Sequence, residues 1–189
     1  MGVTPVTITS NSANILLSNT AGGVGSSSIT VNVPNGGLSG SFFIQALADT
    51  GSGTFTASAS GFTPRTGTVN FAPSGLIITS VRGEVDPNVT STNPFGRTMT
   101  LTAYSLEAGT NVRIDLQAVR GGLTLSPTIN SSAALGVVFP AISLVGGNDL
   151  VFATFTNTSQ GTTVLSIVQP SGFVTPASIF STITVTINN

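Results

Sequence analysis

The sequence predicts an all-β protein built from tandem β-sandwich modules, and three observations support this prediction. Short segments of alternating apolar and polar residues recur along the chain, each bounded by Gly, Asn or Pro. No window has the 3.6-residue periodicity of a helix, and the 22 Gly and 10 Pro residues leave little room for one. Residues 53–64, GTFTASASGFTP, return in blurred form at residues 161–176 as GTTVLSIVQPSGFVTP. A period of about 100 residues favours tandem sandwiches over a solenoid, whose repeats are far shorter.

The first module is expected at residues 1–74. Asn35-Gly36-Gly37 supplies residues that tolerate a positive φ, and the Gly-rich stretch after Asp49 suits a tight hairpin. The break at residues 72–75, APSG, is interpreted as the module junction. Alternation predicts five strands between these turns, at residues 6–10, 28–33, 42–48, 54–59 and 68–71.

The second module is expected at residues 75–189, with seven or eight strands, which is the number found in immunoglobulin domains. Residues 82–97 contain two prolines and no periodicity, so they predict a long loop or an irregular edge. The strands are predicted at residues 76–81, 98–105, 111–118, 123–125, 135–139, 150–156, 162–168 and 181–187.

The two modules differ in how many strands precede the repeated part. Residues 42–49 correspond to residues 150–157 at the offset of 108 residues that relates 53 to 161, and residues 6–9 align best with residues 112–115. Two predicted strands precede residues 112–115 within the second module, whereas none precedes residues 6–9 in the first. The first sandwich is therefore expected to lack its initial strands. Three explanations stay open: a sequence boundary inside a repeat, completion by a strand from a neighbour, or a misalignment with a smaller first domain.

Residues 40–71, and more loosely residues 149–187, resemble the closing hairpin of bacterial immunoglobulin-like repeats of the invasin and intimin type. The resemblance lies in GSGTFTASASGF followed by GTVNF. It implies tandem immunoglobulin-like β-sandwiches in a large surface protein, where such repeats act as stalks or spacers that carry adhesive tips. It supplies no catalytic residues.

Composition excludes most other classes of function. Only 6% of the residues are charged and all five cations are Arg, so nucleic acid is not an expected partner. Cys and His are absent, which excludes disulfides, thiolate chemistry and the common zinc and iron sites. Without His or Lys, a Ser or Thr nucleophile lacks its usual base, so we expect no enzyme and no required cofactor. The longest apolar run, residues 133–145, is too short for membrane insertion and predicts a buried strand.

Two of the six acids form the only metal candidate. Glu84 and Asp86, two residues apart near the module junction, would share a face of an extended segment and could hold Ca²⁺. The simpler interpretation is a solvated polar loop beside Arg82, without a metal ion. Asp49 and its counterpart Asn157 occupy equivalent turns, where an Asx side chain hydrogen-bonds the backbone two residues on.

Two aromatic features are candidates for binding. Tyr104, the only tyrosine, fills the core or offers its ring to a carbohydrate. Phe42 and Phe43 face opposite sides of their strand, so one of the two is expected to be exposed.

Together these observations predict a non-enzymatic structural stalk or spacer on a bacterial surface or in a secreted assembly. Ser, Thr, Asn and Gly occupy positions where cytosolic proteins usually carry Lys and Glu, which indicates an extracellular setting. Its partners are neighbouring immunoglobulin-like modules or copies of itself. Two alternatives stay open: a filament subunit completed by strand exchange between copies, and an adhesin module that binds a carbohydrate or a host surface protein.

Overall fold

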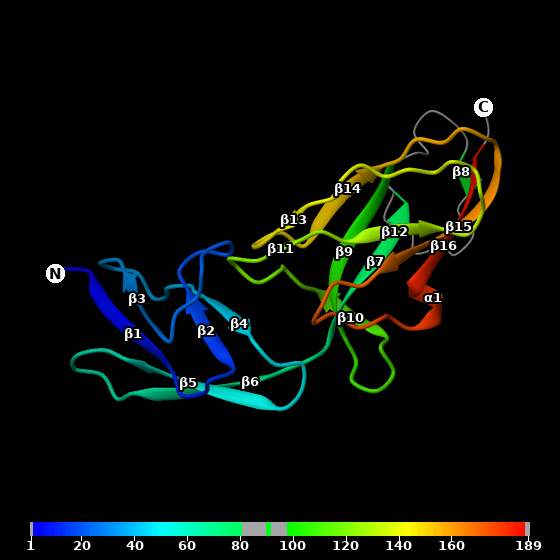
Figure 1. The fold of residues 1–189 in the computed structure, drawn as a ribbon. Coiled ribbons are helices and arrows are strands. Elements are labelled where there is room, and N and C mark those ends of the chain that lie inside the picture. The colour runs from blue at the N-terminus through cyan, green and yellow to red at the C-terminus, as the bar shows by residue number, and fades with distance from the viewer. Residues whose placement is uncertain (1, 81–89, 92–97, 188–189) are drawn as a thin grey trace. The chain divides into compact units, whose positions relative to one another are not determined.

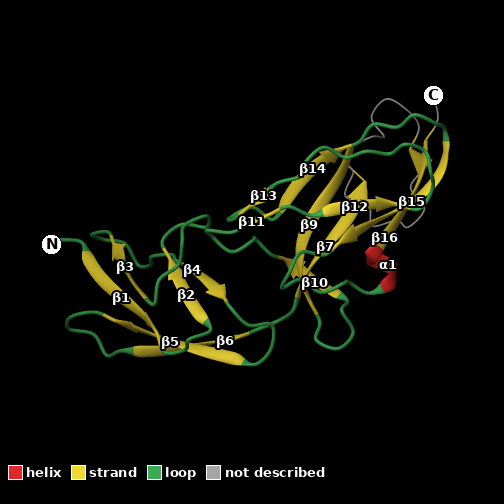
Figure 2. Cartoon of the chain, viewed as in Figure 1, coloured by secondary structure: helices red, strands yellow, loops and turns green. Residues whose placement is uncertain are grey.

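A computed structural model describes residues 2–80, 90–91 and 98–187. In this part of the chain nearly all regular structure is β, and α1 (Ser178–Ser181) is a single helical turn (Figures 1 and 2). Within the three four-stranded sheets and between β2 and β4, the described strand pairs are antiparallel except for β8 and β16, which are parallel. The all-β prediction is confirmed.

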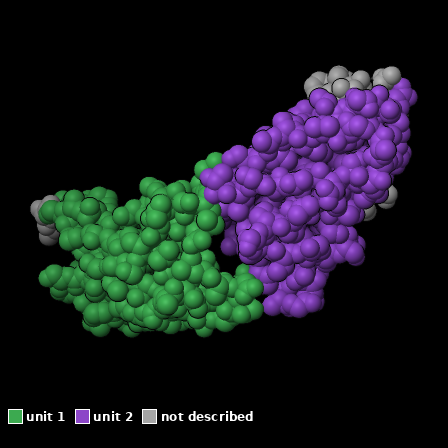
Figure 3. All heavy atoms as spheres, in the orientation of Figure 1, with its two compact units in different colours: residues 1–72, 120–123, 145–147 green, residues 73–119, 124–144, 148–189 purple. Residues whose placement is uncertain are grey.

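The chain divides into two compact units (Figure 3). The first unit comprises residues 1–72 with two short segments, 120–123 and 145–147. The second unit comprises residues 73–119, 124–144 and 148–189.

The first unit contains six strands in two sheets. One sheet has the order β3-β1-β5-β6 and the other pairs β2 with β4. The five predicted strands are present, but β2 was missed because its residues, ILLS, are apolar in succession and do not alternate. The bounds are β1 (Thr4–Ser10), β2 (Ile15–Ser18), β3 (Ser28–Val33), β4 (Phe43–Ala46), β5 (Ser52–Ser58) and β6 (Arg65–Asn70).

The second unit contains two larger sheets and one small one. In one large sheet β9 pairs with β7, β10 and β14; the other has the order β12-β15-β16-β8, and β11 pairs with β13. The bounds are β7 (Ser74–Ser80), β8 (Thr90–Ser91), β9 (Thr98–Leu106), β10 (Arg113–Leu116), β11 (Thr124–Leu125), β12 (Thr128–Ser131), β13 (Leu144–Val145), β14 (Leu150–Thr154), β15 (Gly161–Val168) and β16 (Thr182–Ile187).

Two local predictions for the second unit were wrong. The strand expected at residues 135–139 is reduced to one bridge between Val138 and Thr156, because Gly136 has a φ of 64° and Pro140 lacks an N–H. The apolar run at residues 133–145 is therefore not one buried strand, and only β13 forms in it. Of residues 82–97, which were expected to form a long loop or an irregular edge, only residues 90–91 are described; they form β8, which pairs in parallel with β16.

The core of the second unit lies between its two large sheets. Side chains of β7, β9 and β14 meet those of β15 and β16, and the residues of this cluster are almost fully buried. They are Ile78, Met99, Leu101, Ile142, Ala153, Phe155, Leu165, Ile183, Val185 and Ile187.

The repeated hairpin is present in both units. β5 pairs with β6 in the first unit as β15 pairs with β16 in the second. The turns after β5 and β15 close alike: the N–H of Phe62 donates to Ala59, and that of Phe173 to Pro170. The preceding residues Gly61 and Gly172 have φ values of 80° and 83°, which only glycine adopts freely.

The strand that accompanies the hairpin corrects the sequence alignment. β1 pairs with β5, so its counterpart is β12, which pairs with β15. The segment aligned with it, residues 112–115, lies in β10 and pairs with β9 instead. The short polar stretch of β12 gives little alternation, and this is why the alignment passed over it.

The constant offset of 108 residues also fails in one strand. The core-facing side chains around β4 are Phe42, Ile44 and Ala46, whereas those around β14 are Val151, Ala153 and Phe155. An offset of 108 would align the core-facing residues of β4 with the outward-facing residues of β14, because a shift of one residue along a strand exchanges its two faces. The structural offset here is 109, so Ile44 corresponds to Ala153.

Candidate functional site

The calcium candidates Glu84 and Asp86 lie outside the described residues, so this site stays a prediction. Among the residues that are described, no group of three or more His, Cys, Asp or Glu side chains could hold a metal ion. No helix in the described part is long and apolar enough to cross a membrane.

Two of the polar turn residues hold backbone or loop geometry. Asn157 Nδ2 donates to the carbonyl of Ser159 at 3.1 Å, so this side chain hydrogen-bonds the backbone two residues on, through its amide nitrogen and not through its oxygen. Glu107 Oε2 accepts from Thr110 Oγ1 at 2.6 Å within the loop that leads to β10.

Arg113 lies over two aromatic rings of the second unit. Its guanidinium carbon is 5.5 Å from the centroid of the Tyr104 ring and 5.2 Å from that of Phe180. These distances are typical of cation–π contacts. Arg113 therefore covers one face of the tyrosine ring, and that face is not open for stacking on a sugar.

The most unusual feature in the described part of the chain is the outer edge of β4. The N–H of Leu47 donates to the carbonyl of Asn14 at 2.9 Å, at the end of the β2–β4 ladder. Because the backbone groups of an antiparallel strand alternate between its edges, those of Gln45 also face β2. The N–H and C=O groups of Ile44 and Ala46 face the opposite edge, where no described residue hydrogen-bonds to them.

The second unit fills the corresponding edge with its own strand. The N–H of Ala103 donates to the carbonyl of Asp149 at 2.7 Å, so the backbone groups of Ala153, the counterpart of Ile44, face β9. β9 pairs with β14 along its whole length, from Leu150 to Thr154. No strand of the first unit occupies this position in the described residues, which agrees with the predicted lack of initial strands.

The first unit has a smaller fully buried core than the second, as expected if a strand that would cover its core face is missing. In the first unit the fully buried cluster has only five members, and most of the face around β4, β5 and β6 stays half-buried. The fully buried members are Ile8, Ile15, Leu17, Val31 and Phe71; the half-buried ones are Val6, Ile29, Phe42, Ile44, Ala46, Ala48, Phe55, Ala57 and Val69.

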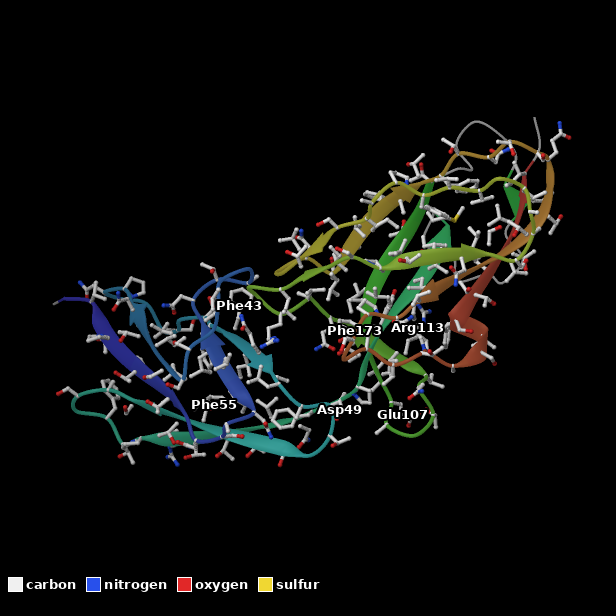
Figure 4. All side chains as sticks on the ribbon, viewed as in Figure 1. Phe43, Asp49, Phe55, Glu107, Arg113 and Phe173 are labelled. Atoms are coloured by element: carbon white, nitrogen blue, oxygen red, sulfur yellow. The ribbon has the colours of Figure 1, made fainter. Side chains whose placement is uncertain are left out.

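Exposed aromatic side chains accompany this open edge. Phe43, on the outward face of β4, is 43% exposed, while Phe42 is half-buried, so one of the pair is exposed as predicted (Figure 4). Phe62 is 69% exposed, whereas its counterpart Phe173 is half-buried. The neighbour of Phe173, Val174, donates its N–H to the carbonyl of Ser74 in β7.

We define the open edge as the outer edge of β4 at Ile44 and Ala46, together with the half-buried core face beside it. The alternation at residues 42–48 predicted the strand correctly. It carried no signal for which edge is unpaired, because that depends on the partners of the strand.

The chain was compared with known proteins in three ways. No protein-family model matches it, and a search of curated proteins found no match. Among solved structures, it is similar to domains 5–6 of the S-layer protein SbsC, with 19% identity, a TM-score of 0.32, and coverage of 100% of this chain and 82% of that one. Domains 4 and 5 of SbsC give 12% identity, a TM-score of 0.36 and full coverage of both chains.

A longer fragment, domains 4–9 of SbsC, gives 18% identity and a TM-score of 0.33, and the match covers 99% of this chain and 26% of that one. Scores this low do not establish a common fold. The architecture described above therefore rests on the strand pairing of this chain alone.

Proposed function

We propose that this chain is a non-enzymatic structural module, a stalk or spacer of a bacterial surface or secreted assembly. The observation that carries the proposal is the repeated unit: β1, β5 and β6 pair in the first unit as β12, β15 and β16 pair in the second. Tandem copies of one β-framework are typical of proteins that extend by repetition. The module division at residues 74 and 75 is part of this proposal.

The strand order of the second unit favours an immunoglobulin-like sandwich. β7, β9 and β14 form one sheet and β12, β15 and β16 the other, which matches strands A, B, E and C, F, G of a constant-type domain. The bridge from Val138 to Thr156 lies where strand D would pair with strand E. The first unit then corresponds to the same sandwich without strands A and B.

The solvent faces of the sheets suit an extracellular setting. Hydroxyl groups pair across neighbouring strands, at 2.8 Å between Thr98 and Thr154 and at 3.0 Å between Thr162 and Thr186. Similar pairs, each at 3.3 Å, join Thr9 to Ser28 and Thr56 to Thr66. Such pairs support a sheet without charged groups, so their strength does not depend on the salt of the surroundings.

An antibody raised against the recombinant chain tests this role. Applied to intact cells of the source organism, it should label their surface or the material that they secrete. Labelling that appears only after the cells are permeabilised would contradict the proposal.

One observation favours a second candidate, a filament subunit completed by strand exchange between copies. The open edge presents backbone groups that have no partner among the described residues, beside a half-buried core, as strand-exchange assemblies require. Ordered polymers of the purified chain that survive SDS would favour this candidate over the spacer.

A further inference from the structure

We propose that the open edge of the first unit is a docking site for one further β-strand of the β9 type, which the described residues of this unit do not supply. This strand would be extended and uncharged, with an aliphatic side chain at every second position. It would lie antiparallel to β4 and complete the sheet that β2 and β4 begin.

The backbone of β4 specifies a strand as the occupant. The N–H and C=O groups of Ile44 and Ala46 point away from β2 and have no described partner. Such groups lose free energy when they are covered by anything that cannot hydrogen-bond to them. An extended backbone satisfies all of them in one ladder, as β9 does for β14.

The core face specifies the side chains. In the second unit, Met99 and Leu101 of β9 stand opposite Ala153 and Val151, and all but Val151 are fully buried. The corresponding positions of the first unit are Ile44 and Phe42, which are only half-buried. Two aliphatic residues spaced like Met99 and Leu101 would therefore cover Ile44 and Phe42.

The lack of charge on β4 and β9 and the exposure of Phe62 also favour an uncharged strand of the β9 type. The residues of β4 and of β9 include no charged side chain, so a charged strand would bury an unpaired charge against an apolar face. In the second unit, β7 covers the turn that holds Phe173 through Ser74 and Val174. The exposure of Phe62 shows that this position is also uncovered in the first unit.

The docking strand would complete the structural module proposed above. The proposal rests on that structural role only for the setting in which the strand and the open edge meet. If the antibody did not label the cell surface, the structural role would be contradicted, but the unfilled edge of β4 and its ability to bind a strand would be unaffected. Failure of a strand to dock would leave the structural role intact.

The test uses the full chain and a labelled peptide with the sequence of β9, TMTLTAYSL. We expect saturable binding, and with the peptide present we expect hydrogen exchange at the amides of Ile44 and Ala46 to slow by about tenfold or more. A peptide carrying Met99→Asn and Leu101→Asn should not bind, because its core face is polar.

Two proline variants locate the site. Ala46→Pro removes an N–H that the β2–β4 ladder does not use, so β4 should still form, but the affinity for the peptide should fall by about tenfold through one lost hydrogen bond. Thr68→Pro is the matched control, since the N–H of Thr68 faces the outer edge of β6 and its loss should leave binding unchanged. If Ala46→Pro does not fold, a spin-labelled peptide should instead broaden the Ile44 and Ala46 resonances of the unaltered chain.

Three outcomes would overturn the proposal. The first is no binding at millimolar peptide. The second is protection of Ile44 and Ala46 in the chain without peptide, which would mean that the chain covers this edge itself or, if the protection rises with concentration, that a second copy does. The third is protection at Thr68 in place of Ile44 and Ala46.

Discussion

A single buried hydroxyl group organises the beginning of the framework in the second unit. Thr163, 2% exposed, accepts a hydrogen bond from the N–H of Ala133 at 3.1 Å and lies 2.7 Å from Ser131 Oγ. It therefore fastens the end of β12 to β15 where regular pairing stops.

Replacing this hydroxyl by a methyl group tests its role. Thr163→Val keeps the shape but leaves the Ala133 N–H without a partner, so we expect a loss of about 1–3 kcal/mol in the free energy of unfolding of the second unit. Thr128→Val, at an exposed position of β12, should cost less than about 0.5 kcal/mol. Urea unfolding measures both, and equal losses would contradict the assignment.

A glycine in the first unit makes room for an aromatic ring. Gly67 stands opposite Phe55, and a Cβ at this glycine would lie 2.5 Å from Phe55 Cζ. The Phe55 ring also packs edge-on against Phe42 at a centroid distance of 5.5 Å. The ring cannot shift without disturbing that contact.

Gly67→Ala should therefore destabilise the first unit by about 1–3 kcal/mol through overpacking. Phe55→Leu in the same chain should recover part of that loss, because the shorter side chain leaves space for the new methyl group. A double-mutant cycle by thermal unfolding measures the coupling, and strictly additive effects would show that the ring is not the obstacle.

Residue-level predictions from the sequence were best where they concerned alternation. The exposure of one of Phe42 and Phe43 followed from the pleat alone. The contact of Tyr104 with Arg113 did not, because Arg113 comes from an adjacent strand and is held over the Tyr104 ring while it also contacts Phe180 of a distant helical turn. The Glu84 and Asp86 site stays a prediction, to be tested by the calcium dependence of Tm.

At the scale of elements, the second unit closes an edge that the first has no need to close. The backbone groups of Leu76 face away from β9, and the side-chain amide of Gln169 pairs with both of them at 2.8 Å. One side chain thus replaces a neighbouring strand and links β7 to the residue after β15.

Gln169→Ala should release this edge. The N–H and C=O of Leu76, a residue only 1% exposed, would lose their partners, at a cost of about 1–3 kcal/mol. We expect faster hydrogen exchange at the Leu76 amide with little change in β5 and β6. Unchanged protection at Leu76 would show that another group takes over.

The elements that the sequence missed have physical reasons in common. β2 is a continuous apolar run, β12 is short and polar, and β13 consists of two residues. None alternates long enough to be recognised. The register error in β4 arose because residues 42–44 and 150–152 are all apolar, so either alignment pairs apolar residues with one another, and only the core distinguishes the two faces.

At the scale of the whole molecule, the two units have unequal cores. The second unit buries ten residues in its main cluster, whereas five are buried in the first. Because burial of apolar surface is the main stabilising term, we expect two thermal transitions, with the first unit unfolding at the lower temperature.

Core substitutions assign the transitions. Ile8→Ala should lower only the first transition and Leu101→Ala only the second, each by about 2–5 kcal/mol, since both side chains are buried. Differential scanning calorimetry measures both variants. A single transition that both substitutions shift equally would show that the units unfold together.

The hydroxyl pairs on the solvent faces predict indifference to salt. Raising NaCl from 0.05 to 0.5 M should change Tm by less than about 2 °C, because neutral hydrogen bonds are not screened. Sodium sulfate at the same concentration should raise Tm and serves as a control for the measurement. A fall of more than about 5 °C in NaCl would indicate that ion pairs carry the stability.

The open edge of β4 has a consequence for the order of events in the life of the chain. If a strand from another polypeptide completes the first unit, this unit reaches its final stability only on assembly, and until then its edge can pair with any extended segment that it meets. Biogenesis would then require that newly made chains be kept apart until the proper strand arrives. Because a docked strand occupies the whole edge, the first strand to bind would exclude every later one from the finished assembly.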